Sequence, residues 1–319
     1  MSALEQNIFN SPLPVVAAGY VGPSLIPNEE APWDEMNLPL KTDELVQKVM
    51  GQPMRRAGRF IKLVCCGALS CLRDVPKEKL AGKKVGIFLS TGLGNVDEIL
   101  PFITQVFKHD GGFPSPNQFA NSVSNAAAFF LAREAGVKGV VLTISEEELS
   151  FESSLWLAQT YLESAQIDLA LVGGCDVFTP TVAESRERMN LTPDNSRLLP
   201  VGEGSSWLLL GGSKENNIGE ILAVQFAPLE KDVSPVNSLP GMETKEKYFL
   251  PGFRVKETQT NIWKDKGWGI NDYLPFCGIH PVAAAFGIAR ALRSKKAGYF
   301  LHHNHNASGR QAFVLSVTK

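Results

Sequence analysis

The sequence predicts an α/β fold, and three features of the 319-residue chain indicate it. Apolar runs without polar interruption, at 84–90 (KVGIFLS) and 168–173 (DLALVG), are typical of strands covered on both faces of a sheet. Helical patterns lie between such runs, so strands and helices alternate along the chain. A composition of 44% hydrophobic and 20% charged residues is that of a globular protein with one large domain or two halves around a shared core.

The elements of the first half follow from these patterns and their boundary residues. Asn95 is expected to cap a helix with Asp97 and Glu98 in its first turn, where the helix dipole favours carboxylates. Gly136 is expected to end another helix. The expected strands are 14–19, 84–90, 137–144 and 168–173, and the expected helices are 42–50, 54–73, 95–109, 119–135 and one that begins at Ser145 or Ser150 and ends near 165.

The second half is patterned less clearly. Residues 180–202 are expected to form a polar connection, and residues 227–275 carry little periodicity, so the fold details of 227–280 stay open. A polar turn is expected at Asn306–Gly309, between two strands. The expected strands are 203–211, 218–226, 299–303 and 311–317, and the expected helix is 281–293.

Several classes of protein are excluded by composition. A formal net charge of −2 gives no reason to expect a nucleic-acid partner, and no apolar run reaches the roughly 18 residues that cross a membrane. The N-terminal residues lack a basic stretch followed by an apolar one, so we expect no signal peptide. The five cysteines are odd in number and indicate neither a disulfide framework nor a metal site, so we expect a reducing, cytoplasmic location. The glycine pair Gly92 and Gly94 is too short a motif for a dinucleotide cofactor, so no cofactor is expected.

Several segments of the chain form recognisable motifs. They are Met54-Arg55-Arg56 before an apolar helix, 116–127 (P-x-x-F-x-x-S-x-x-N-A-A), 151–176 with its terminal G-G-C-D, 201–204 (VGEG) and 280–292 (HPVAAAFGIARAL). Together they resemble the β-ketoacyl synthase family of thiolase-fold condensing enzymes. The resemblance implies a five-layer αβαβα fold. It also implies a ketosynthase-like N-terminal half, 1–210, and a shortened, divergent C-terminal half, 211–319.

The residues that the family uses for catalysis are largely missing. A ketosynthase holds the acyl chain on a cysteine at a helix N-terminus, where the dipole stabilises the thiolate. Counting along the shared segment places that position on Glu148, and a carboxylate cannot replace the thiolate. No H-G-T-G-T segment with the first histidine occurs between 227 and 275. The second histidine corresponds to His280, but the lysine five residues before it is Pro275.

Structural readings compete with functional ones at these residues. Ser145 and Glu148 have the spacing of a capping box, which makes Glu148 a helix-capping residue. Residues 146–148 are three adjacent carboxylates that repel one another, so we expect one of them to meet a basic partner or water. His280 is expected to be a polar cap or a vestige. His303 and His305 would share a strand face, but no cysteine or acid lies nearby in sequence, so no metal site is expected.

The resemblance therefore implies a non-catalytic subunit of the chain-length-factor kind. Such a subunit pairs with an active ketosynthase in type II polyketide systems, works with acyl carrier protein and closes the acyl channel. The residues expected at the channel or interface are Phe113, Pro116, Phe119, Ser122, Asn125, Phe129 and Phe130, with Phe119 nearest the channel. Two alternatives remain: an altered enzyme that decarboxylates or hydrolyses acyl thioesters with Glu148 and His280, and a homodimeric scaffold without chemistry.

Overall fold

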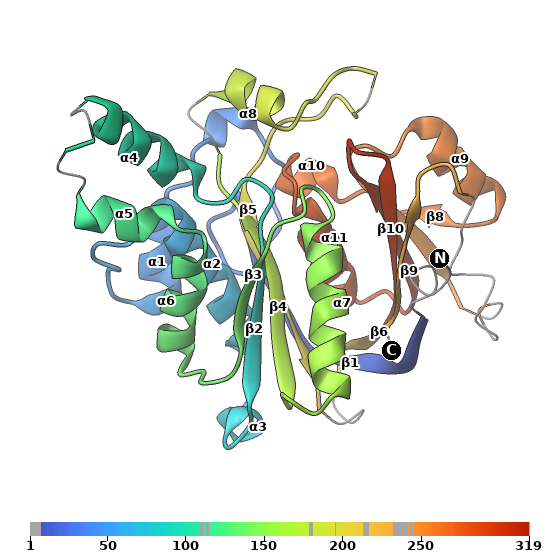
Figure 1. The fold of residues 1–319 in the computed structure, drawn as a ribbon. Helices are drawn as coiled ribbons and strands as arrows, with labels where there is room; N and C mark the ends of the chain where they lie inside the picture. Colours follow the sequence, from blue (N-terminus) through green and yellow to red (C-terminus); the bar gives the residue numbers. More distant parts are fainter. Residues whose placement is uncertain are drawn as a thin grey trace.

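A computed structural model of the chain describes residues 8–108, 111–112, 115–178, 181–194, 196–212, 217–231, 242 and 245–318. Ten strands in these residues form one sheet in the order β3-β2-β4-β5-β1-β6-β10-β9-β7-β8 (Figure 1). The strands are β1 (Ile8–Val21), β2 (Val85–Ser90), β3 (Val141–Ile144), β4 (Leu169–Asp176), β5 (Gly204–Gly211), β6 (Gly219–Pro228), β7 (Lys247–Pro251), β8 (Gly269–Ile270), β9 (Gly298–His305) and β10 (Arg310–Thr318).

The sheet consists of two halves that repeat one another. From the outer edge inward, the first half has the order β3-β2-β4-β5-β1, and the second has β8-β7-β9-β10-β6, which is the same order advanced by five strands. Strand directions repeat as well: β2 is parallel to β3 and β4, and β7 is parallel to β8 and β9. β5 and β10 are antiparallel to both of their neighbours.

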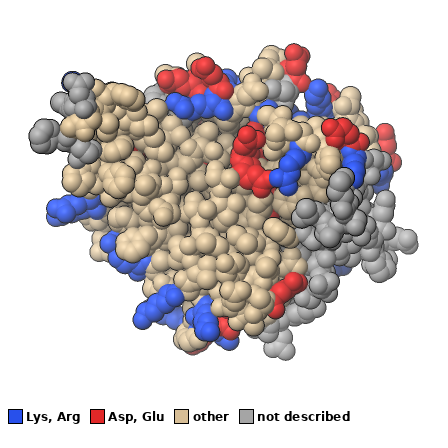
Figure 2. Space-filling model, viewed as in Figure 1, with Lys and Arg blue, Asp and Glu red and all other residues tan. Residues whose placement is uncertain are grey.

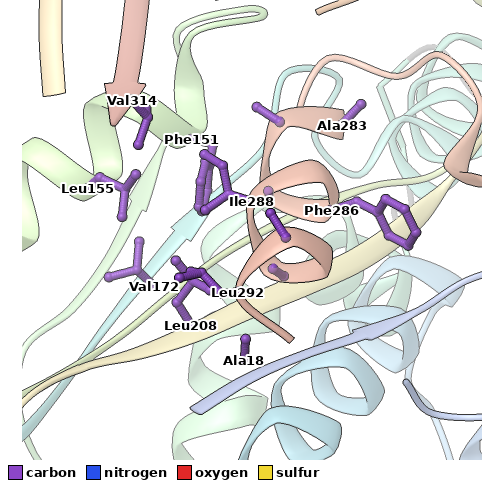
Figure 3. Packing of buried hydrophobic residues seen from close by; sticks show 14 of the residues in the cluster. Ala18, Phe151, Leu155, Val172, Leu208, Ala283, Phe286, Ile288, Leu292 and Val314 are labelled. Carbon is purple, nitrogen blue, oxygen red and sulfur yellow. The ribbon is translucent and has the colours of Figure 1, made fainter. Parts of the chain in front are cut away.

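Helices form the remaining layers, and the five-layer αβαβα arrangement is confirmed. α7 (Ser150–Glu163) and α11 (Ala283–Arg293) lie between the two half-sheets, and Figure 3 shows side chains of both helices packed against the strands. α1 (Thr42–Met50), α2 (Arg59–Leu72) and α6 (Asn125–Ala135) cover the far face of the first half-sheet. α9 (Glu257–Asp265) covers the far face of the second.

Alternating side chains assign each strand face to its layer. On β4, Val172 joins the central core with α7 and α11, whereas Leu171 joins the core beneath α2. Leu208 and Trp207 of β5 divide between the same two cores. Successive strand residues point to opposite faces, so a strand covered on both sides needs an unbroken apolar run. This requirement explains why the buried strands were recognisable in the sequence.

In the described residues, fewer helices cover the outer face of the second half-sheet than that of the first. α1 and α2 both lie between β1 and β2, whereas the described residues between β6 and β7 contain no α-helix. The shortening expected for the C-terminal half is therefore found in the layer outside its sheet. Within the described residues, no helix is long and apolar enough to cross a membrane.

Several expected boundaries were wrong. The helix expected at 119–135 is two helices, α5 (Pro116–Ser122) and α6, because the backbone is extended at Val123. The helix expected from Met54 begins only at Arg59. The side chain of Asn95 does not cap α4 (Val96–Lys108), because its Oδ1 accepts no hydrogen bond from the described residues, while its Nδ2 donates to the carbonyl of Asn121.

Some short elements were not anticipated. The expected polar connection 180–202 contains α8 (Val182–Arg188), and the weakly patterned stretch contains β7, α9, β8 and α10 (Leu274–Cys277). The remaining short helices are η1 (Glu35–Asn37) and α3 (Lys77–Leu80). The expected left-handed C-cap at Gly136 and the turn between β9 and β10 are confirmed.

Candidate functional site around Glu148

Glu148 lies in the loop between β3 and α7 and is bound by an arginine from the other half of the chain. Nε and Nη2 of Arg254 donate to its Oε1 at 2.9 and 2.5 Å. Nη2 also donates to the backbone carbonyl of Met189 at 2.5 Å. Glu148 is 4% exposed and Arg254 is 2% exposed, so the ion pair is buried. The expectation that one of the adjacent carboxylates meets a basic partner is confirmed.

The capping box expected at this loop is wrong. α7 begins at Ser150 with Leu149 as its N-cap, and no side chain caps it there, so Glu148 lies before the helix. The hydroxyl of Ser150 instead accepts from the amide of Glu146 at 2.8 Å and donates to the carbonyl of Thr91 at 3.2 Å. Glu147 has a φ of +49°, a left-handed conformation that non-glycine residues rarely adopt. Glu148 therefore belongs to a tight loop that Ser150 holds against the end of β2.

A buried polar network continues from Glu148 into the second half of the chain. Asn304 of β9 donates from Nδ2 to the carbonyl of Glu148 at 2.7 Å and to Oε1 of Glu152 at 3.0 Å. Nδ1 of His302 lies 3.7 Å from the same Glu152 oxygen, and its Nε2 lies 2.9 Å from the hydroxyl of Tyr273. These residues join α7 to β9 and to the segment before α10.

Burial sets the charge state of this network. It raises the pKa of Glu152 to about 8, so the carboxyl keeps its proton at neutral pH. It lowers the pKa of His302 to about 3, so the imidazole is neutral. The sequence analysis did not single out Glu152 or Arg254. Glu152 lies four residues after Glu148, and this spacing was a sequence signal that could have identified Glu152. No sequence signal marked Arg254.

His280 lies beside the aspartate of the G-G-x-D motif. Its Nδ1 is 3.8 Å from Oδ2 of Asp176, and both residues are buried. Asp176 accepts hydrogen bonds from the hydroxyl of Thr91 at 2.8 Å and from three backbone amides, those of Gly92, Leu93 and Val282, each at 3.0 Å. The aspartate thus ties the end of β2 to the start of α11, next to His280.

The space beside Glu148 is small. A recess of about 110 Å³ is lined by residues that include Leu93, Glu148, Met189, Arg254 and Pro281. At about 30 Å³ per water molecule, this volume holds only a few waters. Ligand pockets of drug-sized molecules have about 300–1,000 Å³, so the recess does not accommodate an extended acyl chain in this conformation.

The residues expected at the channel or interface lie mostly on the surface. Pro116, Phe119, Asn125 and Phe129 are exposed, Phe130 is half-buried and Ser122 is buried. Phe113 lies outside the described residues. Phe119 contacts Phe102 of α4, with ring centroids 5.7 Å apart, and Phe129 contacts Phe130 at 6.2 Å.

The part of the chain that the structure describes contains no group of three or more His, Cys, Asp or Glu that could hold a metal ion. His303 and His305 lie on the same face of β9, as expected, with ring centroids 6.1 Å apart. All five cysteines are buried, and burial raises the pKa of the Cys66 thiol to about 12, which removes its reactivity at neutral pH.

Comparison with known proteins bears on the fold. No protein-family model and no curated sequence matches the chain. Among solved structures, a chain of the ishigamide ketosynthase/chain length factor matches with a TM-score of 0.72 and 14% identity, over 97% of this chain and 99% of that one. The chain has the β-ketoacyl synthase fold.

Two further ketosynthase structures show the same likeness. One is a type II polyketide synthase acyl-carrier protein in complex with its ketosynthase bound to the hexaketide, AntDE:AntF (TM-score 0.73, 12% identity, 97% of this chain and 100% of that one). The other is a β-ketoacyl synthase from Burkholderia phymatum STM815 (0.66, 11%, 97% and 99%). In this fold Glu148 lies directly before the central helix α7, and Asp176 ends the strand that follows it.

Proposed function

We propose that the chain is a non-catalytic, ketosynthase-like subunit that pairs with an active ketosynthase and limits acyl-chain length in type II polyketide biosynthesis. The observation that carries this proposal is the buried ion pair between Glu148 and Arg254. We infer that Glu148 stands at the position of the family's nucleophile. A nucleophile must be free to attack a thioester. Here the position holds a carboxylate whose Oε1 accepts two hydrogen bonds from a guanidinium.

The segment that faces Glu148 from the second half supports the loss of catalysis. β7 is followed by Gly252-Phe253-Arg254-Val255, and Arg254 reaches the carboxylate of Glu148. We infer that Pro251–Val255 stands where the family has H-G-T-G-T, with only the first glycine shared. Proline would then replace the first histidine, and Arg254 would fill the space that a substrate needs.

The proposed acid–base alternative gains no support from the site. Glu148 is held by Arg254, and His280 lies against Asp176, which already accepts four hydrogen bonds. The recess between these elements has room for a few waters only. Purified chain that turned over malonyl-carrier protein, with the activity lost in Glu148→Gln, would support the alternative.

An exposed apolar surface supports the proposal that the chain binds another protein. Most of the exposed large hydrophobic side chains in the described residues belong to α4, α5, α6, β3 and α7, and Phe129 (64% exposed) and Phe119 (57%) are among them. Figure 2 shows that the middle of this face carries few charged side chains. Contiguous exposed apolar surface marks interaction sites in soluble proteins.

An open sheet edge lies on the same face. β3 is the outermost strand of its half and pairs only with β2 in the described residues, so its other edge is open. An open edge strand can pair with a strand of another chain. We therefore propose that the surface of α5, α6 and β3 is the interface with the ketosynthase. We also propose that Pro116, Phe119, Ser122, Asn125 and Phe130 border the acyl channel there.

The names of the structural neighbours support the choice of partners. One is a ketosynthase/chain length factor, and another is a ketosynthase in complex with its acyl-carrier protein. We propose the same kinds of partner for this chain. We also propose that the chain divides near residue 210 into the two halves that the sequence indicated, because the strand order repeats on either side.

Co-expression with a ketosynthase that carries Cys-His-His and is encoded nearby tests this function. We expect a stable one-to-one complex, because burying the apolar face releases water from it. Phe129→Asp should abolish co-purification, whereas Ile262→Asp on α9, another exposed apolar position (52% against 64% for Phe129), should not. A chain that purifies only as its own homodimer would contradict the proposal.

A further inference from the structure

A pocket separate from the Glu148 recess lies on the surface between the two halves of the fold, where α7 contacts β3, β6 and β10 (Figure 1). Its volume is about 320 Å³, and we call it the Trp156 pocket. Ile144, Trp156 and Leu157 line it from the first half of the chain, and Phe226 and Arg310 line it from the second. An occupant of this pocket therefore contacts both halves at once.

The floor of the Trp156 pocket is the edge of the central core. Ile144, Leu157 and Phe226 are each half-buried and pack against the hydrophobic core between the two half-sheets. Trp156 adds an indole that is 38% exposed, whereas the other four tryptophans of the chain are buried. Removal of apolar surface from water is favourable, so this gap in the cover of the core favours an apolar occupant.

Polar side chains form the rim of the pocket. Nη1 of Arg310 donates to Oε1 of Glu146, and the hydroxyl of Ser153 donates to the other carboxylate oxygen. The guanidinium of Arg310 also lies 5.6 Å from the centre of the Phe226 ring. The two charges at the rim compensate each other, so the pocket suits an uncharged occupant.

The state of these polar groups favours a protein over a small ligand. Sites for small molecules combine an apolar lining with a few polar groups that fix the orientation of the ligand. Here the charged groups Glu146 and Arg310 bind each other instead. An apolar centre that contains tryptophan, with arginine and other polar groups at the rim, is typical of a protein–protein interface.

The pocket is continuous with the open edge of the sheet. Ile144 is the last residue of β3, and the outer edge of β3 has no neighbouring strand in the described residues. Val141, at the other end of β3, is 37% exposed. A strand that paired with β3 would lie about 4.8 Å from it and would pass beside Ile144 and the pocket. The pocket therefore adjoins the proposed ketosynthase interface on α5, α6 and β3.

We propose that the active ketosynthase binds this chain by inserting an uncharged aromatic or branched aliphatic side chain into the Trp156 pocket. This inference rests on the proposed function and extends its interface across α7 to β6 and β10. A few aromatic residues in well-packed pockets carry most of the binding free energy of an interface, and Trp156 takes that role here.

The dissociation constant of the co-expressed complex, measured by sedimentation over a dilution series, tests the pocket. Trp156→Asp should raise this constant by at least about tenfold, because a charge would be buried against the partner's apolar side chain. Ile26→Asp is the matched control, since Ile26 lies in the loop after β1 and has a similar exposure of 44%. It should leave the dissociation constant unchanged.

Acrylamide quenching of tryptophan fluorescence is a second readout that needs only a conservative variant. All five tryptophans lie in the described residues, and Trp156 is the exposed one. The difference in emission between the parent chain and Trp156→Phe therefore isolates Trp156, also in the complex, where the partner's tryptophans cancel. Acrylamide should quench this difference several-fold less in the complex than in the chain alone.

The outcomes separate this inference from the proposed function. A complex that forms equally well with Trp156→Asp, or in which Trp156 stays accessible to acrylamide, overturns the inference and leaves the proposed function standing. A parent chain that forms no complex overturns both. Protection of Trp156 in the chain alone as its concentration rises identifies a second copy as the occupant and also overturns the inference.

Discussion

Arg254 binds Glu148 through two hydrogen bonds to a single carboxylate oxygen, across 106 residues of sequence and between the two halves of the fold. A buried pair of this kind contributes little net stability when complete, but removal of one partner leaves an uncompensated charge in the interior. The pair therefore holds the Glu148 side chain in place and makes position 148 intolerant of single changes.

Glu148→Gln should destabilise the chain by about 3–5 kcal/mol, because the Arg254 guanidinium stays buried without a counter-charge. Urea denaturation followed by circular dichroism measures the change. Glu147→Gln, at the exposed neighbouring carboxylate, is the control and should change the free energy of unfolding by less than about 0.5 kcal/mol. In the double variant Glu148→Gln, Arg254→Met much of the loss should be recovered, and simple additivity of the two losses would contradict this account.

Protonation of Glu152 should make the free energy of unfolding depend on pH. Burial raises its pKa to about 8, above the value in the unfolded chain, so stability falls as pH rises between the two values. The slope contributed by one such group is about 1.4 kcal/mol per pH unit. His302 has a lowered pKa, and its effect has the opposite sign but is confined to pH values below about 6.5.

The clean window for Glu152 is therefore about pH 6.5 to pH 8. Glu152→Gln should flatten the stability profile there, and its stability relative to the parent chain should rise with pH. Denaturation midpoints at several pH values measure this difference, with Glu257→Gln as an exposed acid for comparison. Parallel profiles for parent and Glu152→Gln would show that Glu152 is ionised in the folded chain.

Phe119→Ala should lengthen the product of a reconstituted ketosynthase complex, if Phe119 closes the acyl channel as proposed. Its ring is 57% exposed on α5 and rests against Phe102, so it can contact a partner without a change in the fold. Mass spectrometry of the released products measures chain length. Ile262→Ala on α9 is the control, and an unchanged length distribution in Phe119→Ala would remove the assignment.

Gly173→Ala should destabilise the chain by about 1–3 kcal/mol through overpacking. A Cβ at this position of β4 would overlap the indole of Trp207 on the neighbouring strand, and Trp207 is fully buried and cannot move away. Gly22→Ala, where a Cβ meets no atom within 4 Å, is the matched control. Thermal unfolding of the two variants separates the effect of packing from that of glycine flexibility.

Local sequence patterns predicted the strands that are covered by apolar side chains on both faces and the helix end that glycine sets. The strands of the two-sided sheet require unbroken apolar runs, and Gly136 ends its helix because it adopts a left-handed conformation at little cost. Patterns failed where a side chain had competing partners. Ser145 and Glu148 have capping-box spacing, yet Ser150 holds the loop and Arg254 takes the carboxylate.

The sequence by itself determined the ketosynthase-like fold, because that fold depends on motifs that are continuous along the chain. Only the tertiary structure decided what surrounds Glu148. Arg254 and Asn304 reach Glu148 from residues 106 and 156 positions away, and they do so because β7 and β9 are neighbours in the second half-sheet. Pairing between such distant residues depends on strand order, which no local pattern encodes.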